Sequence, residues 1–113
     1  MEIRPLWVRD RAVRGPSSDV LGGSVDGCPA ATAMVGRDGH RGRVYYRAVE
    51  SGRRRMGHGR TMTLAAEAWV RAAGVPKIQL MVRSSNAAAL GFYDALGLAA
   101  EDTSVRSRWL GPR

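Results

Sequence analysis

The first half of the chain alternates short apolar runs with turn residues, a pattern that is typical of antiparallel strands. Asp26-Gly27 and Gly36–His40 supply turn residues between these runs. Residues 7–19 are rich in Arg, Pro, Gly and Ser, so this segment is predicted to be a loop. The strands are expected over Met1–Leu6, Val20–Ser24, Ala30–Val35 and Arg43–Val49.

The spacing of apolar residues changes after these strands, and Thr61–Ala73 has the period of an amphipathic helix. Gly74 can adopt the left-handed conformation that ends a helix, and Pro76 prevents the helix from resuming. One apolar stripe is expected to face the core, and it comprises Leu64, Ala65, Ala68, Trp69 and Ala72.

A second strand and a second helix follow. Lys77–Val82 alternates as a strand, with Ile78, Leu80 and Val82 predicted on one face. Ser84, Ser85 and Asn86 offer an N-cap for a helix over Ala87–Leu96, which Gly97 ends. Ser104–Leu110, with Val105 and Trp109 among arginines and serines, is predicted as the last strand.

The order strand, strand, strand, strand, helix, strand, helix, strand predicts an α/β fold. We expect a mixed, largely antiparallel sheet with two packed helices. A chain of 113 residues has room for one domain, so residues 1–113 are predicted to form it.

Composition is that of an ordinary globular protein, with 44% hydrophobic and 25% charged residues. No run approaches the length of a membrane span, and the N-terminus lacks the apolar region of a signal peptide. Cys28 is the single cysteine, so neither a disulfide nor a cysteine-based metal site is expected. These features predict a cytoplasmic protein without a membrane partner.

The net charge of +8 raises the alternative of a basic nucleic-acid-binding protein. All 18 basic residues except Lys77 are arginine. Aromatic residues do not alternate with these arginines, so no platform for stacking bases is visible. An anionic cofactor accounts for the charge as well, and nucleic acid remains the less favoured partner.

The most informative segment is Arg54-Arg55-Met56-Gly57-His58-Gly59, followed by Arg60-Thr61. It lies between a predicted strand and a predicted helix. Glycines at such a turn leave backbone N–H groups uncovered, and the helix N-terminus behind them carries a partial positive charge. This combination suits a phosphate or pyrophosphate group. The alternative interpretation is a glycine-rich connection that binds nothing.

This segment and one further motif resemble the GNAT superfamily of acyl-CoA-dependent N-acyltransferases. Arg54-Arg55-Met56-Gly57-His58-Gly59 matches the family's Gln/Arg-x-x-Gly-x-Gly/Ala cofactor motif. Asn86-Ala87-Ala88-Ala89-Leu90-Gly91-Phe92-Tyr93 matches its Asn-x-x-Ala-x-x-x-Tyr signature, and Leu96-Gly97-Leu98 is also typical. The resemblance extends from about Ala30 to Leu110 and implies an acyl-CoA N-acyltransferase-like fold.

The resemblance implies transfer of an acetyl group from acetyl-CoA to a primary amine, by direct attack in a ternary complex. Tyr93 is then the acid that protonates the leaving thiolate. Asn86 contacts the coenzyme arm in addition to capping its helix, although the cap alone would explain it. Ala48 and Val49 border the pantetheine arm, and the Val49 N–H polarises the thioester carbonyl. By the same resemblance, the pyrophosphate is bound by Arg54, Arg55, Met56, Gly57, His58, Gly59, Arg60 and Thr61.

The general base and the acceptor stay open. Glu50 or an ordered water relay is a candidate base, whereas His40 and His58 are interpreted as exposed loop residues. Family members place two helices after the first strand, and Trp7–Asp19 is too short for them. The sheet near Met1–Leu6 and Ala30–Val35 is therefore expected to expose apolar surface, which favours a homodimer. A non-catalytic module that binds coenzyme A or a partner is the alternative function.

Overall fold

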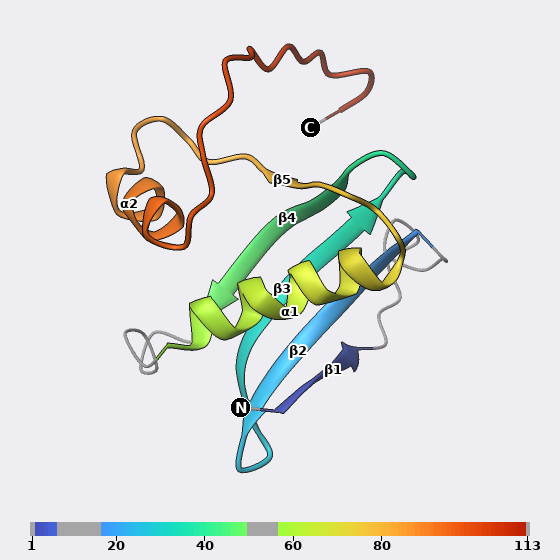
Figure 1. The fold of residues 1–113 in the computed structure, drawn as a ribbon, viewed down its shortest axis with the longest axis vertical. Coiled ribbons are helices and arrows are strands. Elements are labelled where there is room, and N and C mark those ends of the chain that lie inside the picture. The colour runs from blue at the N-terminus through green and yellow to red at the C-terminus, as the bar shows by residue number, and fades with distance from the viewer. Residues whose placement is uncertain (1, 7–16, 50–56, 113) are drawn as a thin grey trace. The chain divides into compact units, whose positions relative to one another are not determined.

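A computed structural model describes residues 2–6, 17–49 and 57–112 of the chain. Their contacts form two compact units, Met1–Met81 and Val82–Arg113. The first unit contains a sheet and helix α1, His58–Ala72, and the second contains helix α2, Ala87–Ala95 (Figure 1). Neither α1 nor α2, the helices of the described residues, is long and apolar enough to cross a membrane.

The sheet is mixed and largely antiparallel, as the sequence predicts. Its strands lie side by side in chain order. Neighbouring strands from β1 to β4 pair antiparallel, whereas β4 and β5 pair parallel across the connection that contains α1. The strands are β1 Glu2–Leu6, β2 Ser18–Val25, β3 Cys28–Arg37, β4 Gly42–Val49 and β5 Ile78–Leu80.

The predicted turns confirm the antiparallel meander. Asp26 and Gly27 both have positive φ, 51° and 79°, as a two-residue hairpin turn requires. Cys28 follows this turn as the exposed first residue of β3. In the next turn, Asp38 Oδ1 accepts hydrogen bonds from the N–H groups of Arg41 at 2.8 Å and His40 at 3.0 Å. Both bonds lower the pKa of the Asp38 carboxyl, and the bond from the Arg41 N–H has the larger effect.

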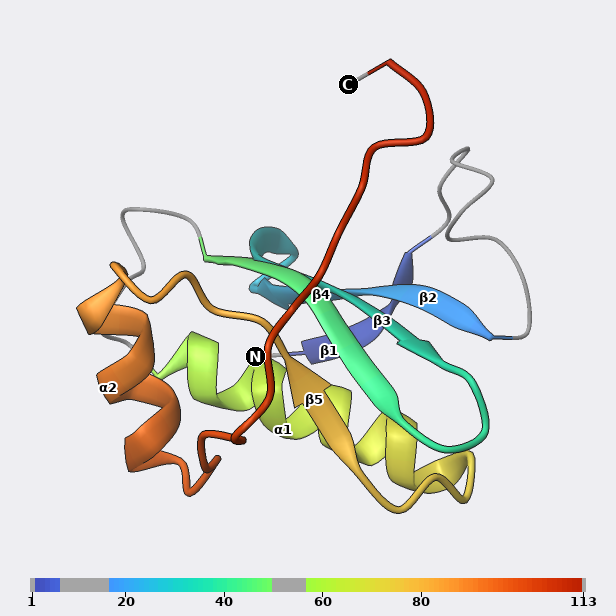
Figure 2. The ribbon, with the colours of Figure 1, turned by 90° about the horizontal axis from the view of Figure 1, so that it is seen from above.

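Helix α1 lies across one face of the sheet (Figure 2), but the face that it buries differs from the predicted stripe. Leu64 is 50% exposed, and Ala68 and Ala72 are exposed as well. The helix is apolar on more than one side, so its period alone could not choose between neighbouring stripes. The side chains that it buries are Met62, Thr63, Ala66 and Val70.

The core joins the sheet to α1, with Ile3, Ala65, Trp69, Ile78 and Leu80 packed at its margin. Ala30, Ala31, Ala33 and Val35 are at most 5% exposed, and Thr32 and Met34 are half-buried, so residues 30–35 expose less apolar surface than the sequence predicts. Ala31, Ala33 and Val35 are buried because their side of β3 packs under α1. The core residues are Leu21, Ala31, Ala33, Val35, Val44, Met62 and Ala66.

Both helices end where the sequence predicts. Gly74 follows α1 with φ 76°, and the N–H of Gly74 donates to the carbonyl of Arg71 at 2.9 Å. Gly97 follows α2 with φ 86°. Positive φ at these positions is available to glycine at little cost, which is why the local sequence marks the helix ends.

Two predicted strands differ from the structure. The strand predicted over Lys77–Val82 is confined to Ile78–Leu80. Ser104–Leu110 forms no strand, and Val105, Trp109 and Leu110 are 71%, 67% and 94% exposed. An alternating pattern needs a neighbouring strand to hydrogen-bond its backbone, and the structure forms no such pairing along this segment.

Candidate functional site

The first turn of α1 has the geometry of an anion site. Gly57 is its N-cap, with φ 79° and no capping side chain, and a Cβ built on Gly57 would meet no atom of the described residues within 4 Å. The N–H groups of the first helical residues, His58, Gly59 and Arg60, have no acceptor within the helix itself. A negatively charged group placed at the N-terminal end of α1 would meet these donors and the positive end of the helix.

Thr61 closes this turn instead of opening it. Its N–H donates to the carbonyl oxygen of Gly57 at 3.1 Å, and its hydroxyl donates to the same oxygen at 3.0 Å. The resemblance assigns Thr61 to the pyrophosphate. In the structure the N–H of Thr61 is already donated to Gly57, so the candidate main-chain donors of the described turn are those of residues 58–60.

His58 is not the exposed loop residue that the sequence suggested. It is the first residue of α1 and is half-buried. Its Nε2 is buried and has no hydrogen-bond partner among the described residues. A buried polar atom without a partner costs about 1–3 kcal/mol, so the ring is held there by its surroundings. His40, by contrast, is exposed in the turn before β4.

β5 pairs with only the first three residues of β4. The parallel pairing covers only Gly42 with Ile78, Arg43 with Gln79 and Val44 with Leu80, whereas β4 continues to Val49. The place where the pairing ends is also the place of a β-bulge. Both figures show α1 beginning at the end of the sheet where β4 finishes.

The bulge is centred on Tyr45. Met34 of β3 faces Tyr46, and Val35 faces Val44, so Tyr45 is the extra residue of β4. A bulge bends its strand and increases the local twist. The pairing with β5 stops at Val44 because β5 itself ends at Leu80. Ala48 and Val49 therefore lie on a stretch of β4 that pairs with Thr32 and Ala31 of β3 and not with β5.

In the second unit, Asn86 caps α2 as predicted. Its Oδ1 accepts a hydrogen bond from the N–H of Ala89 at 3.1 Å. Tyr93 is half-buried, and its ring meets the ring of Phe92 edge to face, with centroids 5.0 Å apart. Tyr93 follows Asn86 by about two helical turns, so both lie on the same side of α2.

The remaining candidates lie outside the described residues. These are Arg54, Arg55 and Met56 of the glycine motif, together with Glu50 as a candidate base. Trp69, interpreted from the sequence as a core residue, packs at the core margin with the Arg37 guanidinium 6.0 Å from its ring centroid. No group of His, Cys, Asp or Glu residues suited to a metal ion occurs in the described part of the chain.

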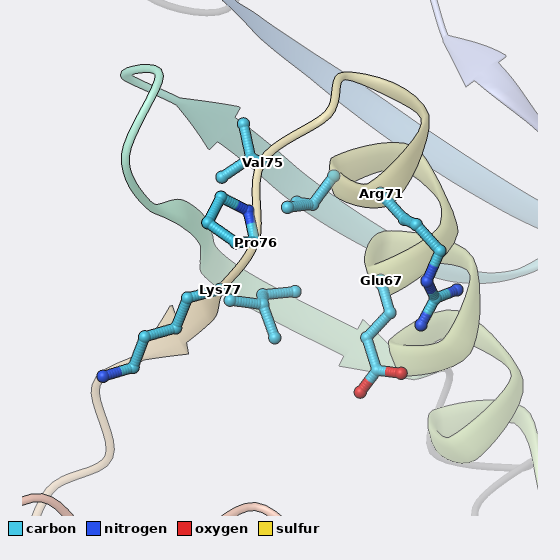
Figure 3. A pocket seen from close by; sticks show the side chains of 7 residues that line it. Glu67, Arg71, Val75, Pro76 and Lys77 are labelled. Carbon is cyan, nitrogen blue, oxygen red and sulfur yellow. The ribbon is translucent and has the colours of Figure 1, made fainter.

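A separate hollow of about 230 Å3 lies between the second half of α1 and the start of β5 (Figure 3). Val70 and Ile78 contribute to its apolar lining. Lys77 extends away from Glu67 and Arg71, so the charged groups do not converge on one point. None of the predicted cofactor residues lines this hollow. The other residues that line the hollow are Glu67, Arg71, Val75, Pro76 and Lys77, which Figure 3 labels.

The chain is similar to acetyltransferases in sequence and in fold. It is 36% identical over 86 residues to an acetyltransferase of Yersinia pestis, which covers 76% of this chain and 61% of the relative. It thus spans about 61% of the length of that curated relative. It is 28% identical to the ribosomal-protein-S18-alanine N-acetyltransferase of Escherichia coli, with a TM-score of 0.68 over 74% of this chain and 54% of that one.

A third comparison supports the fold alone. An aminoglycoside N-acetyltransferase solved in complex with coenzyme A has a TM-score of 0.76 at 13% identity, over 84% of this chain and 78% of that one. The model of the acetyltransferase (GNAT) family matches residues 2–98, which include the whole sheet and both helices. The chain therefore belongs to the GNAT family of acetyltransferases.

Proposed function

We propose that this chain binds acetyl-CoA and transfers the acetyl group to a primary amine. The observation that carries the proposal is the glycine-led start of α1 beside the end of β4 (Figure 1), the part of that strand with which β5 does not pair. Family membership supports acyl transfer from acetyl-CoA in general. The aminoglycoside acetyltransferase of similar fold was solved with coenzyme A, which supports the choice of cofactor.

The described residues fit such a cofactor at its pyrophosphate. Gly57 presents open space and no capping side chain, and N–H groups of the first turn of α1 lie behind it. In the proposal, the N–H groups of residues 58–60 bind the pyrophosphate, and Arg54 and Arg55 add positive charge. Met56 and Thr61 complete the segment, Thr61 by fixing the turn.

The pantetheine arm is proposed to follow β4 beyond Val44, past Ala48 and Val49. Beyond Val44, β4 pairs with no strand of the described residues on its β5 side, and an unpaired strand edge can accept an extended chain. The Val49 N–H would then polarise the thioester carbonyl as a single donor. Asn86 would contact the same arm with the part of its amide that the helix cap does not use.

In the proposed reaction the coenzyme supplies an activated acetyl group as a thioester. The amine attacks the carbonyl carbon directly, the carbon–nitrogen bond forms and the carbon–sulfur bond breaks. The Tyr93 hydroxyl gives its proton to the leaving sulfur. The proton of the attacking amine passes to Glu50 or to a water relay. No acyl-enzyme is required.

The proposed acceptor is a small-molecule or protein amine in a cytoplasmic setting. A second copy of the chain is the proposed partner. Its support now comes from Val105 and Leu110, apolar side chains that are exposed within one short segment of the second unit. Light scattering checks the dimer, and a monomer at all concentrations would refute it. The single-domain organisation over residues 1–113 also remains a proposal.

A transfer assay tests the proposed activity. The purified chain is incubated with acetyl-CoA and a panel that contains an aminoglycoside, a polyamine and peptides with free N-termini. Free thiol and the mass of the acetylated amine are both measured, and acetyl-CoA without an amine controls for hydrolysis. Thiol release that matches a mass gain of one acetyl group supports the proposal. If the cofactor binds and no amine is acetylated, the non-catalytic alternative is favoured.

A further inference from the structure

The two glycines at the start of α1 are each tied to a threonine four residues later. The hydroxyl of Thr61 donates to the carbonyl oxygen of Gly57 at 3.0 Å. The hydroxyl of Thr63 donates to the carbonyl oxygen of Gly59 at 2.8 Å. The spacing is four residues in both pairs, so the two hydroxyls donate to carbonyl oxygens of the same helical turn.

This turn needs such support because glycine is a poor helix residue. A glycine in a helix is less favourable than alanine by about 1 kcal/mol, since it loses more backbone freedom on folding. Gly57 has no side chain with which to cap the helix, and Gly59 stands in the first turn. The first turn of a helix also has the fewest hydrogen bonds. Without further bonds, the direction of its N–H groups would be poorly fixed.

Thr63 is placed to supply one of these bonds from inside the protein. It is 3% exposed and is the buried polar residue of the described core. Its neighbours along the helix on the same face, Met62 and Ala66, are fully buried. A buried hydroxyl requires a partner, and the carbonyl of Gly59 is the partner that it has. The bond therefore links the packed core directly to the glycine turn.

We propose that Thr61 and Thr63 are positioning residues for the cofactor's pyrophosphate, an inference that rests on the proposed function. They touch no ligand. Each holds the carbonyl of one glycine, and so orients the peptide groups whose N–H donors face the anion. Glycine gives the ligand access to the backbone, and the two threonines supply the rigidity that glycine lacks. Thr63 does so from the core and Thr61 from the surface.

The test compares Thr63→Val, which keeps the shape and removes the hydroxyl, with Thr63→Ser, which keeps the hydroxyl and removes a methyl group. Amide hydrogen exchange by NMR is measured in the ligand-free protein at residues 61–63, whose N–H groups bond to the first turn. Binding of coenzyme A is measured by calorimetry on the same samples. Thermal unfolding reports whether each variant is folded.

Thr63→Val is expected to speed exchange at residues 61–63 and to weaken coenzyme A binding by about tenfold, the size expected for one lost hydrogen bond. Thr63→Ser is expected to stay within about twofold of the parent in both measurements. A purely structural threonine would give a different pattern. Thermal stability would then fall in both variants, and the affinity of the folded protein for coenzyme A would not change.

Thr61→Val and Thr61→Ser repeat the comparison at the exposed hydroxyl, so they decide the question if Thr63→Val fails to fold. Parent-like exchange and affinity in the folded valine variant would overturn the proposal. If the parent itself does not bind coenzyme A, the proposed function fails. In that case, unchanged amide exchange in the valine variants still refutes the idea that the threonine hydroxyls hold the turn. Faster exchange supports that idea for the turn itself, without a role in binding the cofactor.

Discussion

Gly42 of β4 lies so close to Val70 of α1 that a Cβ on Gly42 would overlap both methyl groups of Val70. The N–H of Gly42 also donates to the carbonyl of Lys77 at 2.7 Å, which joins the start of β4 to the segment that leads into β5. Val70 is 2% exposed. This contact brings the second half of α1 onto the sheet and turns Val70 inward.

We therefore expect Gly42→Ala to destabilise the fold by about 1–3 kcal/mol, as overpacking of a core does. Gly91→Ala is the matched control, because a Cβ on Gly91 in α2 meets nothing within 4 Å. Alanine there should stabilise by up to about 1 kcal/mol through helix propensity. Denaturant unfolding measures both. Adding Val70→Ala to Gly42→Ala should recover part of the loss, and equal stability of Gly42→Ala and the parent would refute the contact.

Gly57→Val is expected to weaken coenzyme binding by more than about tenfold in a chain that stays folded, because a branched side chain would fill the space before the helix. Gly59→Val should act in the same direction. Gly27→Val is the control for backbone strain, since Gly27 has the same φ of 79° and equally open surroundings in the turn between β2 and β3. Strain alone costs about 1–2 kcal/mol at either position.

Calorimetry with coenzyme A distinguishes the two effects. Gly27→Val should bind like the parent at a similar loss of thermal stability. If Gly57→Val binds as tightly as Gly27→Val, the phosphate interpretation of this turn is wrong.

Tyr93→Phe should lower kcat by about tenfold to a hundredfold, with a smaller change in affinity for acetyl-CoA. The hydroxyl acts mainly when the sulfur leaves, and a thiolate is already a fairly stable leaving group, so the effect should lie at or below the lower end of the usual range for a general acid. Phenylalanine preserves the edge-to-face contact with Phe92, whereas Tyr93→Leu removes it and controls for packing. An unchanged rate, with chemistry shown to limit turnover, would assign Tyr93 to packing.

Asn86 allows the cap to be separated from the contact with the coenzyme arm. Asn86→Ala removes the bond to the Ala89 N–H and should cost about 1 kcal/mol of stability. Asn86→Ser keeps a capping oxygen and removes the amide, so its stability should approach that of the parent while binding of acetyl-CoA weakens. Ser85→Ala, at the exposed neighbouring position, is the control. If Asn86→Ser binds acetyl-CoA as tightly as the parent, Asn86 serves only as the cap of α2.

The sequence predicted what single residues determine locally. Asp26-Gly27, Gly74 and Gly97 were placed at their turns and helix ends because positive φ restricts the choice of residue. The side chain of Asn86 identified its cap for a similar reason. These features need no knowledge of distant parts of the chain.

Features set by distant partners were not predictable in the same way. The apolar spacing predicts Leu64 in the core, but α1 packs on the sheet through the face that contains Val70, which lies against Gly42. Leu64 is therefore left exposed. The bulge at Tyr45 could not be recognised in the sequence. Val44 and Tyr46 on either side are apolar too, so the alternation of apolar and polar residues gives no register at this point. Ser104–Leu110 has a strand pattern, yet strand formation depends on pairing that the segment itself does not encode.

At the candidate site, the glycine motif and the Asn86–Tyr93 signature were visible in the sequence, whereas the threonine tethers were not recognised. Their signal was present as a threonine four residues after each glycine, the spacing at which a hydroxyl can reach a helix carbonyl. The half-buried ring of His58 had no such signal, since its burial follows from the start of α1 and the packing around it.

Calorimetric titration of the folded chain with acetyl-CoA tests the central claim most directly. We predict saturable binding of one cofactor per chain, with an affinity that falls as ionic strength rises because the pyrophosphate contributes through charge. Gly57→Val should lose this binding and Gly27→Val should keep it. No heat of binding at about 1 mM acetyl-CoA, from a sample shown to be folded by its thermal unfolding transition, would contradict the account.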